Sequence, residues 1–378
     1  EIGVRLVGSE MCIRDRYTDV TKVEEKEFRA TVEIKGKALY PKLDVLFAMM
    51  REILMESKLG DEKRLKEILS MLKTRLQTSF LSAGHTTAVL RSLSYTSPIA
   101  RFRDITSGIG FYEVVKDLEE NFEERKELLI ENLKKIAGRI FRKENLMLSY
   151  TSAQEGLAVL EKAVPQFADS LHTGEKESHG QCIIHCKKRN EGFRTSSKVQ
   201  YVARTGNFID GGAEYTGALQ ILKVILSYDY LWQNVRVKGG AYGCMSGFNR
   251  IGEGYLVSYR DPNLEKTMEI YEGVVDYLKN FDIDDRDMNK FIIGTISNLD
   301  RPMNPAAKGS RSLNLYMNRI TEEMIRRERE QILDAQQEDI RGLATVLEAV
   351  LAAGELCVIG SEEKIEEAKE MFGEIRTL

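Results

Sequence analysis

The chain has 378 residues, of which 42% are hydrophobic and 30% charged, with a net charge of −4. This composition is typical of a globular protein, and the balance of 59 acidic and 55 basic residues gives no sign of a nucleic-acid partner. The longest apolar run, GLATVLEAVLAAGELCVIG, contains Glu348 and Glu355, so we expect no membrane span.

The opening segment differs from the rest of the chain. Residues 1–16, EIGVRLVGSEMCIRDR, show no clear period and resemble a translated sequencing adapter, so we expect them to be non-native or disordered. The first residue is Glu rather than Met, and we therefore interpret the chain as the tail of a longer protein. Five scattered cysteines predict reduced thiols, and no secretory signal is visible, so we expect a cytoplasmic protein.

The first half of the chain shows mainly helical patterns. Alternation over residues 27–36 predicts a strand, and amphipathic periods predict helices over 39–57, 61–82 and 122–141. The short apolar run 145–151, NLMLSYT, predicts a further strand.

A weak internal repeat links the two ends of the chain. LMLSYTSAQEGLAVLEKAV resembles ELCVIGSEEKIEEAKEMF, because each has an apolar run, a serine, acidic residues and a helical pattern. Ser152 and Glu155 fit a capping box, and Ser361 can cap the second helix. The repeat predicts two tandem related domains, and their predicted limits are residues 17–170 and 198–378, joined by a linker over 171–197.

The second half mixes strands and helices. We expect a strand at 198–204, a long helix at 215–235, two strands at 240–248 and 254–260 that form a hairpin, and several helices over 264–353. Strands and helices alternate unevenly and two strands form a hairpin, which favours an α+β fold over a doubly wound parallel sheet. In the expected α+β fold, each domain has a mostly antiparallel sheet packed with helices.

Several familiar catalytic and metal-binding patterns are absent. The chain has no Walker A sequence, G-x-G-x-x-G, G-x-S-x-G, H-E-x-x-H or H-x-x-E-H. The segment HGQCIIHC brings together His179, Cys182, His185 and Cys186, which are zinc-type ligands. On a strand, however, His185 would face away from the two cysteines, so a linker strand is favoured over a zinc site. For His85 we expect packing or capping rather than catalysis.

One stretch, NVRVKGGAYG, combines residues that can bind a ligand. Gly239 and Gly240 permit a sharp turn, Arg236 offers a fork of hydrogen-bond donors, and the Tyr242 hydroxyl can donate to a carbonyl oxygen. The alternative is a glycine cap after a helix, with the arginine on the surface and the tyrosine in the core. The residues alone favour this alternative.

A family resemblance changes that balance. RVKGGAYG and GYLVSYRDPNL resemble the C-terminal half of the presequence-protease branch (peptidase family M16, subfamily C) of the pitrilysin/insulinase zinc metallopeptidases. FRKENLMLSYT, SAGHTTAVLRSLSY, EGFRTSSKVQYVARTGNF and NPAAKGSRSLNLY also resemble this branch, so the resemblance covers about residues 17–378.

The resemblance implies four related α+β domains in two halves that close over a peptide. It assigns the zinc and its inverted H-x-x-E-H motif to the first half, which is absent from this chain. It implies that Arg236 and Tyr242, six residues apart, position the substrate and assist at the scissile carbonyl, with Gly239 and Gly240 beside them.

Two further basic residues, Lys308 and Arg311, lie in LDRPMNPAAKGSRS. They could line the substrate chamber, but solvated charges on a rigid loop between helices are favoured.

The expected function follows from this division. We expect the C-terminal, substrate-binding half of an oligopeptide-degrading zinc metalloendopeptidase, which binds no metal itself and is inactive alone because it cannot generate a zinc hydroxide. Its expected partners are a peptide substrate and a zinc-bearing N-terminal half. Two alternatives remain, namely a naturally separate non-catalytic partner subunit and a peptide-binding scaffold without an enzymatic partner.

Overall fold

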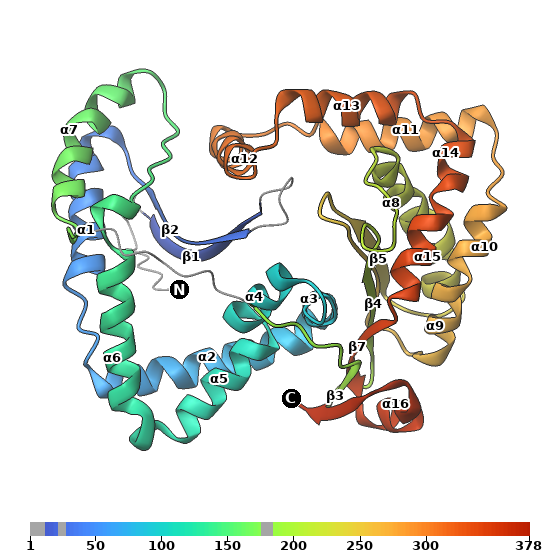
Figure 1. The fold of residues 1–378 in the computed structure, drawn as a ribbon, viewed down its shortest axis with the longest axis horizontal. Helices are drawn as coiled ribbons and strands as arrows, with labels where there is room; N and C mark the ends of the chain where they lie inside the picture. Colours follow the sequence, from blue (N-terminus) through green and yellow to red (C-terminus); the bar gives the residue numbers. More distant parts are fainter. Residues whose placement is uncertain (1–11, 22–27, 175–183) are drawn as a thin grey trace.

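The computed structural model describes residues 12–21, 28–174 and 184–378 (Figure 1). A two-stranded sheet and a series of helices form the first part, and a six-stranded sheet with helices forms the second. The expected α+β fold is confirmed. In the part of the chain that the structure describes, no helix is both long enough and apolar enough to span a bilayer.

The first part begins with an antiparallel hairpin. Strand β1 (Cys12–Thr21) pairs with β2 (Phe28–Lys37), and the predicted strand at 27–36 is confirmed. Of the segment expected to be non-native or disordered, residues 1–11 lie outside the described residues and residues 12–16 form the first half of β1.

Seven helices follow in the described residues: α1 (Leu43–Met55), α2 (Glu62–Ser82), α3 (Gly84–Leu93), α4 (Pro98–Ser107), α5 (Ile109–Glu120), α6 (Phe122–Ile140) and α7 (Glu155–Asp169). The three helices predicted from apolar periods are confirmed. The Asp61 side chain caps α2 by accepting a hydrogen bond from the N–H of Arg64 at 3.0 Å. Figure 1 shows α1, α6 and α7 as an arch that lies apart from the large sheet, and α2 leads from this arch toward the sheet.

The predicted strand at 145–151 is wrong. This segment has no strand partner, and Met147 and Leu148 are 52% and 41% exposed. The predicted capping box is wrong too, because the Ser152 hydroxyl bonds to the carbonyl of Ala153 and no side chain caps α7. A short apolar run becomes a strand only where another strand offers hydrogen bonds. Just after this segment, the backbone N–H of Ala153 bonds to the Tyr40 hydroxyl.

The second copy of the repeat does form a strand and a helix. Strand β7 (Glu355–Ser361) leads into α16 (Glu362–Glu367), and Ser361 occupies the cap position without a side-chain hydrogen bond. Strand β7 lies in the interior of the large sheet, so its apolar residues are buried on both faces.

The large sheet has the order β5-β6-β4-β7-β3-β8. The bounds of its other strands are β3 (Glu191–Thr195), β4 (Tyr201–Asn207), β5 (Gly243–Phe248), β6 (Glu253–Tyr259) and β8 (Glu374–Thr377). Strand β3 runs parallel to β7 and β8, and the other neighbours are antiparallel. The predicted hairpin is confirmed as β5–β6. The prediction of a linker is wrong for residues 191–195, because β3 is held between two strands.

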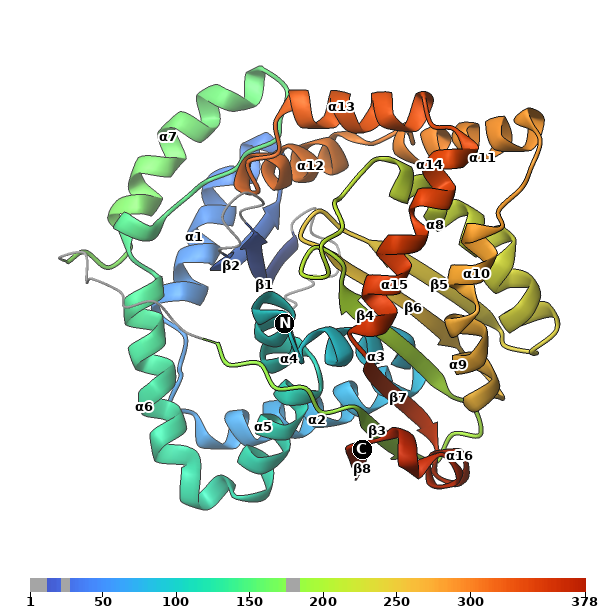
Figure 2. The ribbon, with the colours of Figure 1, turned by 45° about the vertical axis from the view of Figure 1, so that its right-hand side comes forward.

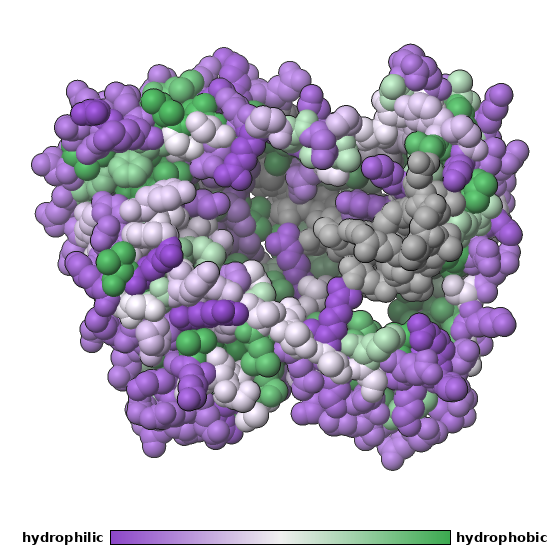
Figure 3. All heavy atoms as spheres, turned by 180° about the vertical axis from the view of Figure 1, so that it is seen from behind, coloured by the Kyte–Doolittle hydropathy of each residue, from purple (hydrophilic) through white to green (hydrophobic). Residues whose placement is uncertain are grey.

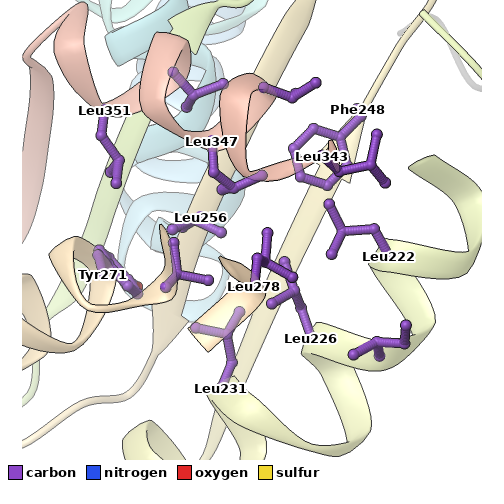
Figure 4. Packing of buried hydrophobic residues seen from close by; sticks show 14 of the residues in the cluster. Leu222, Leu226, Leu231, Phe248, Leu256, Tyr271, Leu278, Leu343, Leu347 and Leu351 are labelled. Atoms are coloured by element: carbon purple, nitrogen blue, oxygen red, sulfur yellow. The ribbon is translucent and has the colours of Figure 1, made fainter. Parts of the chain in front are cut away.

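Helices of the second part cover one face of this sheet. Those that contact its strands are α8 (Ala218–Tyr228), α9 (Glu265–Glu272) and α15 (Ala344–Ala352), and packed on these are α10 (Val274–Lys279), α11 (Asp285–Leu299), α13 (Glu322–Leu333) and α14 (Gln337–Gly342). Helix α12 (Pro305–Met317) has no buried residue and lies away from the sheet (Figure 1). Figure 4 shows the main core, where Leu222 and Leu226 of α8 meet Leu256 of β6 and Leu347 of α15. Helix α8 has apolar residues on several sides and is therefore buried between the sheet and the neighbouring helices.

Helices of the first part cover the opposite face, as Figure 2 also shows for α3. Phe80, Ala88 and Tyr112 pack against Phe193 and Tyr201 in a second core. The first part thus buries the sheet of the second part. The limits 17–170 and 198–378 remain a prediction, and the contacts between the two segments are extensive. Seen from behind, the space-filling view shows a mostly hydrophilic outer surface with scattered apolar side chains (Figure 3).

Candidate functional site

The stretch identified in the sequence follows α8. The chain continues in helical form after Tyr228 and ends in a π-helical turn over Trp232–Val237. The backbone N–H of Lys238 bonds to the carbonyl of Gln233 at 3.0 Å, five residues earlier, which is the wide bonding of a π-helix. Such wide turns often occur at functional sites because they shift side chains from their α-helical positions.

The two glycines end this turn. Gly240 adopts a left-handed conformation with φ of 82°, and its N–H bonds to the carbonyl of Arg236 at 2.9 Å. A Cβ atom on Gly239 would lie 2.4 Å from the carbonyl oxygen of Val235. Both positions therefore require glycine, and the expected glycine cap is confirmed.

The guanidinium of Arg236 stacks over the indole of Trp232, with Cζ 3.8 Å from the ring centroid. Among the described residues its side chain makes no ion pair. Stacking on an aromatic face fixes the plane of the guanidinium and leaves its edge N–H groups available to a ligand.

Tyr242 lies immediately before β5 rather than in it. Its side chain is 67% exposed, so the expectation of a core tyrosine is wrong. Its ring meets that of Tyr259 edge to face, with centroids 5.7 Å apart, and its backbone N–H bonds to the carbonyl of Arg260 at 3.2 Å. The side chain is thus largely exposed, while the ring contact and the backbone hydrogen bond hold it.

These residues line one pocket with a volume of about 610 Å³. Its lining residues are Trp232, Arg236, Val237, Gly240, Ala241, Tyr242 and Arg260. The structure therefore brings together Arg236, Tyr242 and Gly240, as the motif predicts, while Gly239 lies in the turn behind them. The sequence interpretation missed Trp232 and Arg260, although Arg260 stands in the quoted segment GYLVSYRDPNL.

Arg260 has an unusual backbone conformation. Its φ is 49°, a left-handed value that costs a non-glycine residue about 1 kcal/mol or more. The next residue, Asp261, is held by Gln200, because the two residues exchange two backbone hydrogen bonds of 2.9 and 2.7 Å. The side chain of Asp261 is buried and accepts hydrogen bonds from the Thr267 hydroxyl and the N–H of Asn263. Burial raises the pKa of Asp261, and these hydrogen bonds oppose the rise.

An aromatic cluster connects the pocket to the first part of the chain. The His85 ring lies edge to face against Tyr259, with centroids 4.7 Å apart, and Tyr201 lies beside both. The Tyr201 hydroxyl donates to the carbonyl of Leu81 at 2.6 Å. The packing role expected for His85 is confirmed, and burial lowers its pKa. Through this cluster, α3 supports the residue against which Tyr242 rests.

Lys308 and Arg311 do not line this pocket. They lie on α12, where the Asn304 side chain caps the helix by accepting from the N–H of Ala307 at 2.9 Å. Both side chains are exposed. The expected loop is wrong from Pro305 onward, because proline at the first helical position and asparagine at the cap are strong helix-start signals.

No group of three or more metal-ligating side chains occurs within residues 12–21, 28–174 and 184–378. Of the cluster considered from the sequence, His179 and Cys182 lie outside the described residues, whereas His185 and Cys186 lie in irregular chain. The pocket offers hydrogen-bond donors and aromatic faces, which can hold and polarise a carbonyl or carboxylate group.

Two family models match this chain. The model described as PreP C-terminal domain matches residues 190–362, which include the whole pocket, and the model of the segment associated with subfamily C of the M16 peptidases matches residues 14–118. Protein HypA of Clostridium perfringens is 36% identical over 357 residues, which cover 94% of this chain and 36% of that protein. Presequence protease 1 of Arabidopsis thaliana is 30% identical over 336 residues, covering 89% of this chain and 31% of that protein.

A solved structure agrees on the fold. The peptidase M16 inactive domain from Pseudomonas fluorescens superposes with a TM-score of 0.55 at 13% identity, covering 92% of this chain and 81% of that chain. At this identity the likeness concerns the fold alone. This chain spans about a third of the length of the two curated relatives, since it covers 36% and 31% of them. The chain belongs to the presequence-protease branch of the pitrilysin/insulinase (M16) peptidase family and corresponds to the C-terminal part of its members.

Proposed function

We propose that this chain is the peptide-holding, non-catalytic part of a zinc metalloendopeptidase that degrades oligopeptides in a closed chamber. The observation that carries the proposal is the pocket in which Arg236 and Tyr242 lie together. Both side chains can donate hydrogen bonds, and neither is used up by an acidic partner in the described residues.

The local structure explains why this pair suits a peptide carbonyl. The stacked indole of Trp232 fixes the Arg236 guanidinium, and Tyr259 supports the Tyr242 ring. Donors held in advance can stabilise the charge that develops on a carbonyl oxygen during hydrolysis without a further ordering cost.

The reaction itself requires a second component. A zinc ion bound by an N-terminal segment or a partner subunit would supply the hydroxide that attacks the peptide bond. In this arrangement Arg236 and Tyr242 act across the chamber from the metal. They orient the peptide and donate hydrogen bonds to the carbonyl oxygen of the bond that is cut.

The test uses the longer protein that contains this segment, or this chain combined with a zinc-bearing N-terminal segment. Arg236→Ala and Tyr242→Phe should each lower kcat/KM for an oligopeptide about 10²-fold, the usual effect of losing one stabilising donor. Bound zinc, measured by atomic absorption, should not change. Tyr316→Phe is a matched control, because Tyr316 lies on α12 and is 75% exposed.

The outcomes separate the possible arrangements. Unchanged kinetics in both Arg236→Ala and Tyr242→Phe would contradict the assigned roles. Activity restored by a separately expressed zinc-bearing chain would identify a two-chain enzyme. Chelator-sensitive peptide cleavage by this chain alone would contradict the division of labour.

A further inference from the structure

The pocket has a basic residue that the carbonyl-binding role does not use. Arg260 lines the pocket with Arg236 and Tyr242, and its guanidinium lies over the Tyr259 ring with Cζ 5.4 Å from the centroid. Among the described residues it forms no ion pair. A second arginine without an acidic partner beside the first gives the pocket a positive charge, although the chain as a whole carries a net charge of −4.

The neighbouring acidic residue, Asp261, forms no ion pair with Arg260 and therefore does not neutralise its charge. Asp261 is buried, and its carboxylate accepts hydrogen bonds from Thr267 and Asn263 rather than from Arg260. Lys238 does not line the pocket but carries a further positive charge at the end of the π-helical turn, where its ammonium group donates to the Asn234 side chain at 3.2 Å. The pocket is thus chemically suited to a negatively charged group.

The backbone fixes where Arg260 stands relative to the carbonyl-binding pair. Its carbonyl accepts the hydrogen bond from the N–H of Tyr242, so the two residues are held in register. Its left-handed conformation departs from the extended path of β6, and a kink of this kind redirects a side chain at the end of a strand. Strained conformations that persist next to a pocket are often retained for a function.

We infer that Arg260 binds a carboxylate of the peptide, either an acidic side chain or the free C-terminus, beside the carbonyl held by Arg236 and Tyr242. The inference rests on the proposed function for the identity of the ligand as a peptide. Arginine suits this role because its planar fork can bond both oxygens of a carboxylate. Arg260 is therefore a specificity residue, and substrates with a carboxylate at this position are preferred.

The experiment measures binding to the 378-residue chain itself by fluorescence anisotropy, without any cleavage. The probes are dye-labelled versions of one peptide. Glu and Gln versions with amidated C-termini test the side chain, and free-acid and amidated versions of the Gln peptide test the terminus. The carboxylate that binds should lower Kd about five- to tenfold relative to its amide, as expected for one partly exposed charge-assisted contact.

The variants identify the residue responsible. Arg260→Gln should abolish the difference between acid and amide peptides, and Arg260→Lys should keep only part of it. Arg319→Gln is the matched control, because Arg319 is another exposed arginine with a left-handed φ, 53°, and does not line the pocket. It should keep the full difference.

Failure of the inference differs from failure of the proposed function. Equal affinity for acid and amide peptides, lack of measurable binding to this chain, or a difference that survives in Arg260→Gln would overturn the inference. None of these results affects the expected loss of turnover in Arg236→Ala. Conversely, unchanged turnover in Arg236→Ala would refute the proposed function even if Arg260 discriminates carboxylates.

Discussion

The backbone N–H of Tyr242 donates to the carbonyl oxygen of Arg260 at 3.2 Å, which joins two segments of chain at one wall of the pocket. Tyr242 enters this contact from a glycine turn, and Arg260 enters it from a left-handed kink at the end of β6. The position of each side chain therefore depends on the backbone of both segments. Substitutions that alter the backbone conformation of either segment therefore test how the site is held together.

Replacing Arg260 with glycine should stabilise the fold relative to replacing it with alanine. Glycine adopts a φ near 49° without steric cost, whereas alanine retains the strain. We expect the free energy of unfolding of Arg260→Gly to exceed that of Arg260→Ala by about 1 kcal/mol, measured by urea denaturation. The pair Arg319→Gly and Arg319→Ala should show a similar difference, since Arg319 shares this conformation. A more stable alanine variant would show that the kink at Arg260 carries no strain.

The glycine turn should not tolerate a side chain. Gly239→Ala would place a Cβ atom 2.4 Å from the carbonyl oxygen of Val235, so the turn must open. We expect a loss of about 1–3 kcal/mol in unfolding free energy, and lower peptide turnover in the completed enzyme because Arg236 and Tyr242 would separate. Gly342→Ala is a matched control, since a Cβ atom at Gly342 would meet nothing within 4 Å and helical Gly→Ala changes are neutral or favourable. Equal effects of the two substitutions would argue against a required turn.

A buried ion pair should hold the first part of the chain to the sheet. The Arg91 guanidinium on α3 bonds to both carboxylate oxygens of Glu191 on β3 at 2.6 and 2.8 Å, and to Asp104 at 2.7 Å. Removing Arg91 leaves two buried carboxylates with only the partly exposed Arg376, Arg189 and Arg101 near them, so Arg91→Ala should cost about 3–5 kcal/mol in chemical denaturation. The exposed pair of Arg194 and Glu366 provides the comparison, and Glu366→Ala should cost less than about 1 kcal/mol.

The same pair predicts a response to acid. Burial acts to raise the pKa of Glu191, but the hydrogen bonds and charge of Arg91 outweigh it and lower this pKa below its ordinary value of 4.5. The stabilisation is therefore fully present above pH 4.5 and is lost as pH falls through the lower pKa of the folded state. Glu191→Gln should flatten the pH dependence of unfolding free energy in this range. An unchanged acid profile would mean that other carboxylates dominate it.

The sequence predicted the parts of this structure that depend on local chemistry. The glycine turn follows from Gly239 and Gly240, and the hairpin of β5 and β6 follows from alternation and a turn between them. The sequence did not predict the parts of the structure that depend on residues far apart in the chain. Residues 145–151 have the composition of a strand but no neighbouring strand in the described structure, and the left-handed Arg260 precedes a bridge between Asp261 and Gln200, which is distant in sequence. Arg236 and Tyr242 came from a motif, and only the structure shows that they share a pocket.

His85 should make stability depend on pH near neutrality. Burial lowers the pKa of His85 from its ordinary value of 6.5, and its Nδ1 atom is buried without a hydrogen-bond partner in the described structure. The unfolded chain therefore binds a proton more readily than the folded chain, and unfolding free energy should fall as pH drops through 6.5 toward the lower pKa of the folded state. Thermal unfolding at several pH values between about 5 and 8 should show this slope, and His85→Phe should remove it while keeping the ring contact. Tyr259→Phe changes the same cluster but keeps the His85 imidazole, so it should retain the slope. A slope that persists in His85→Phe would assign the pH dependence to another group.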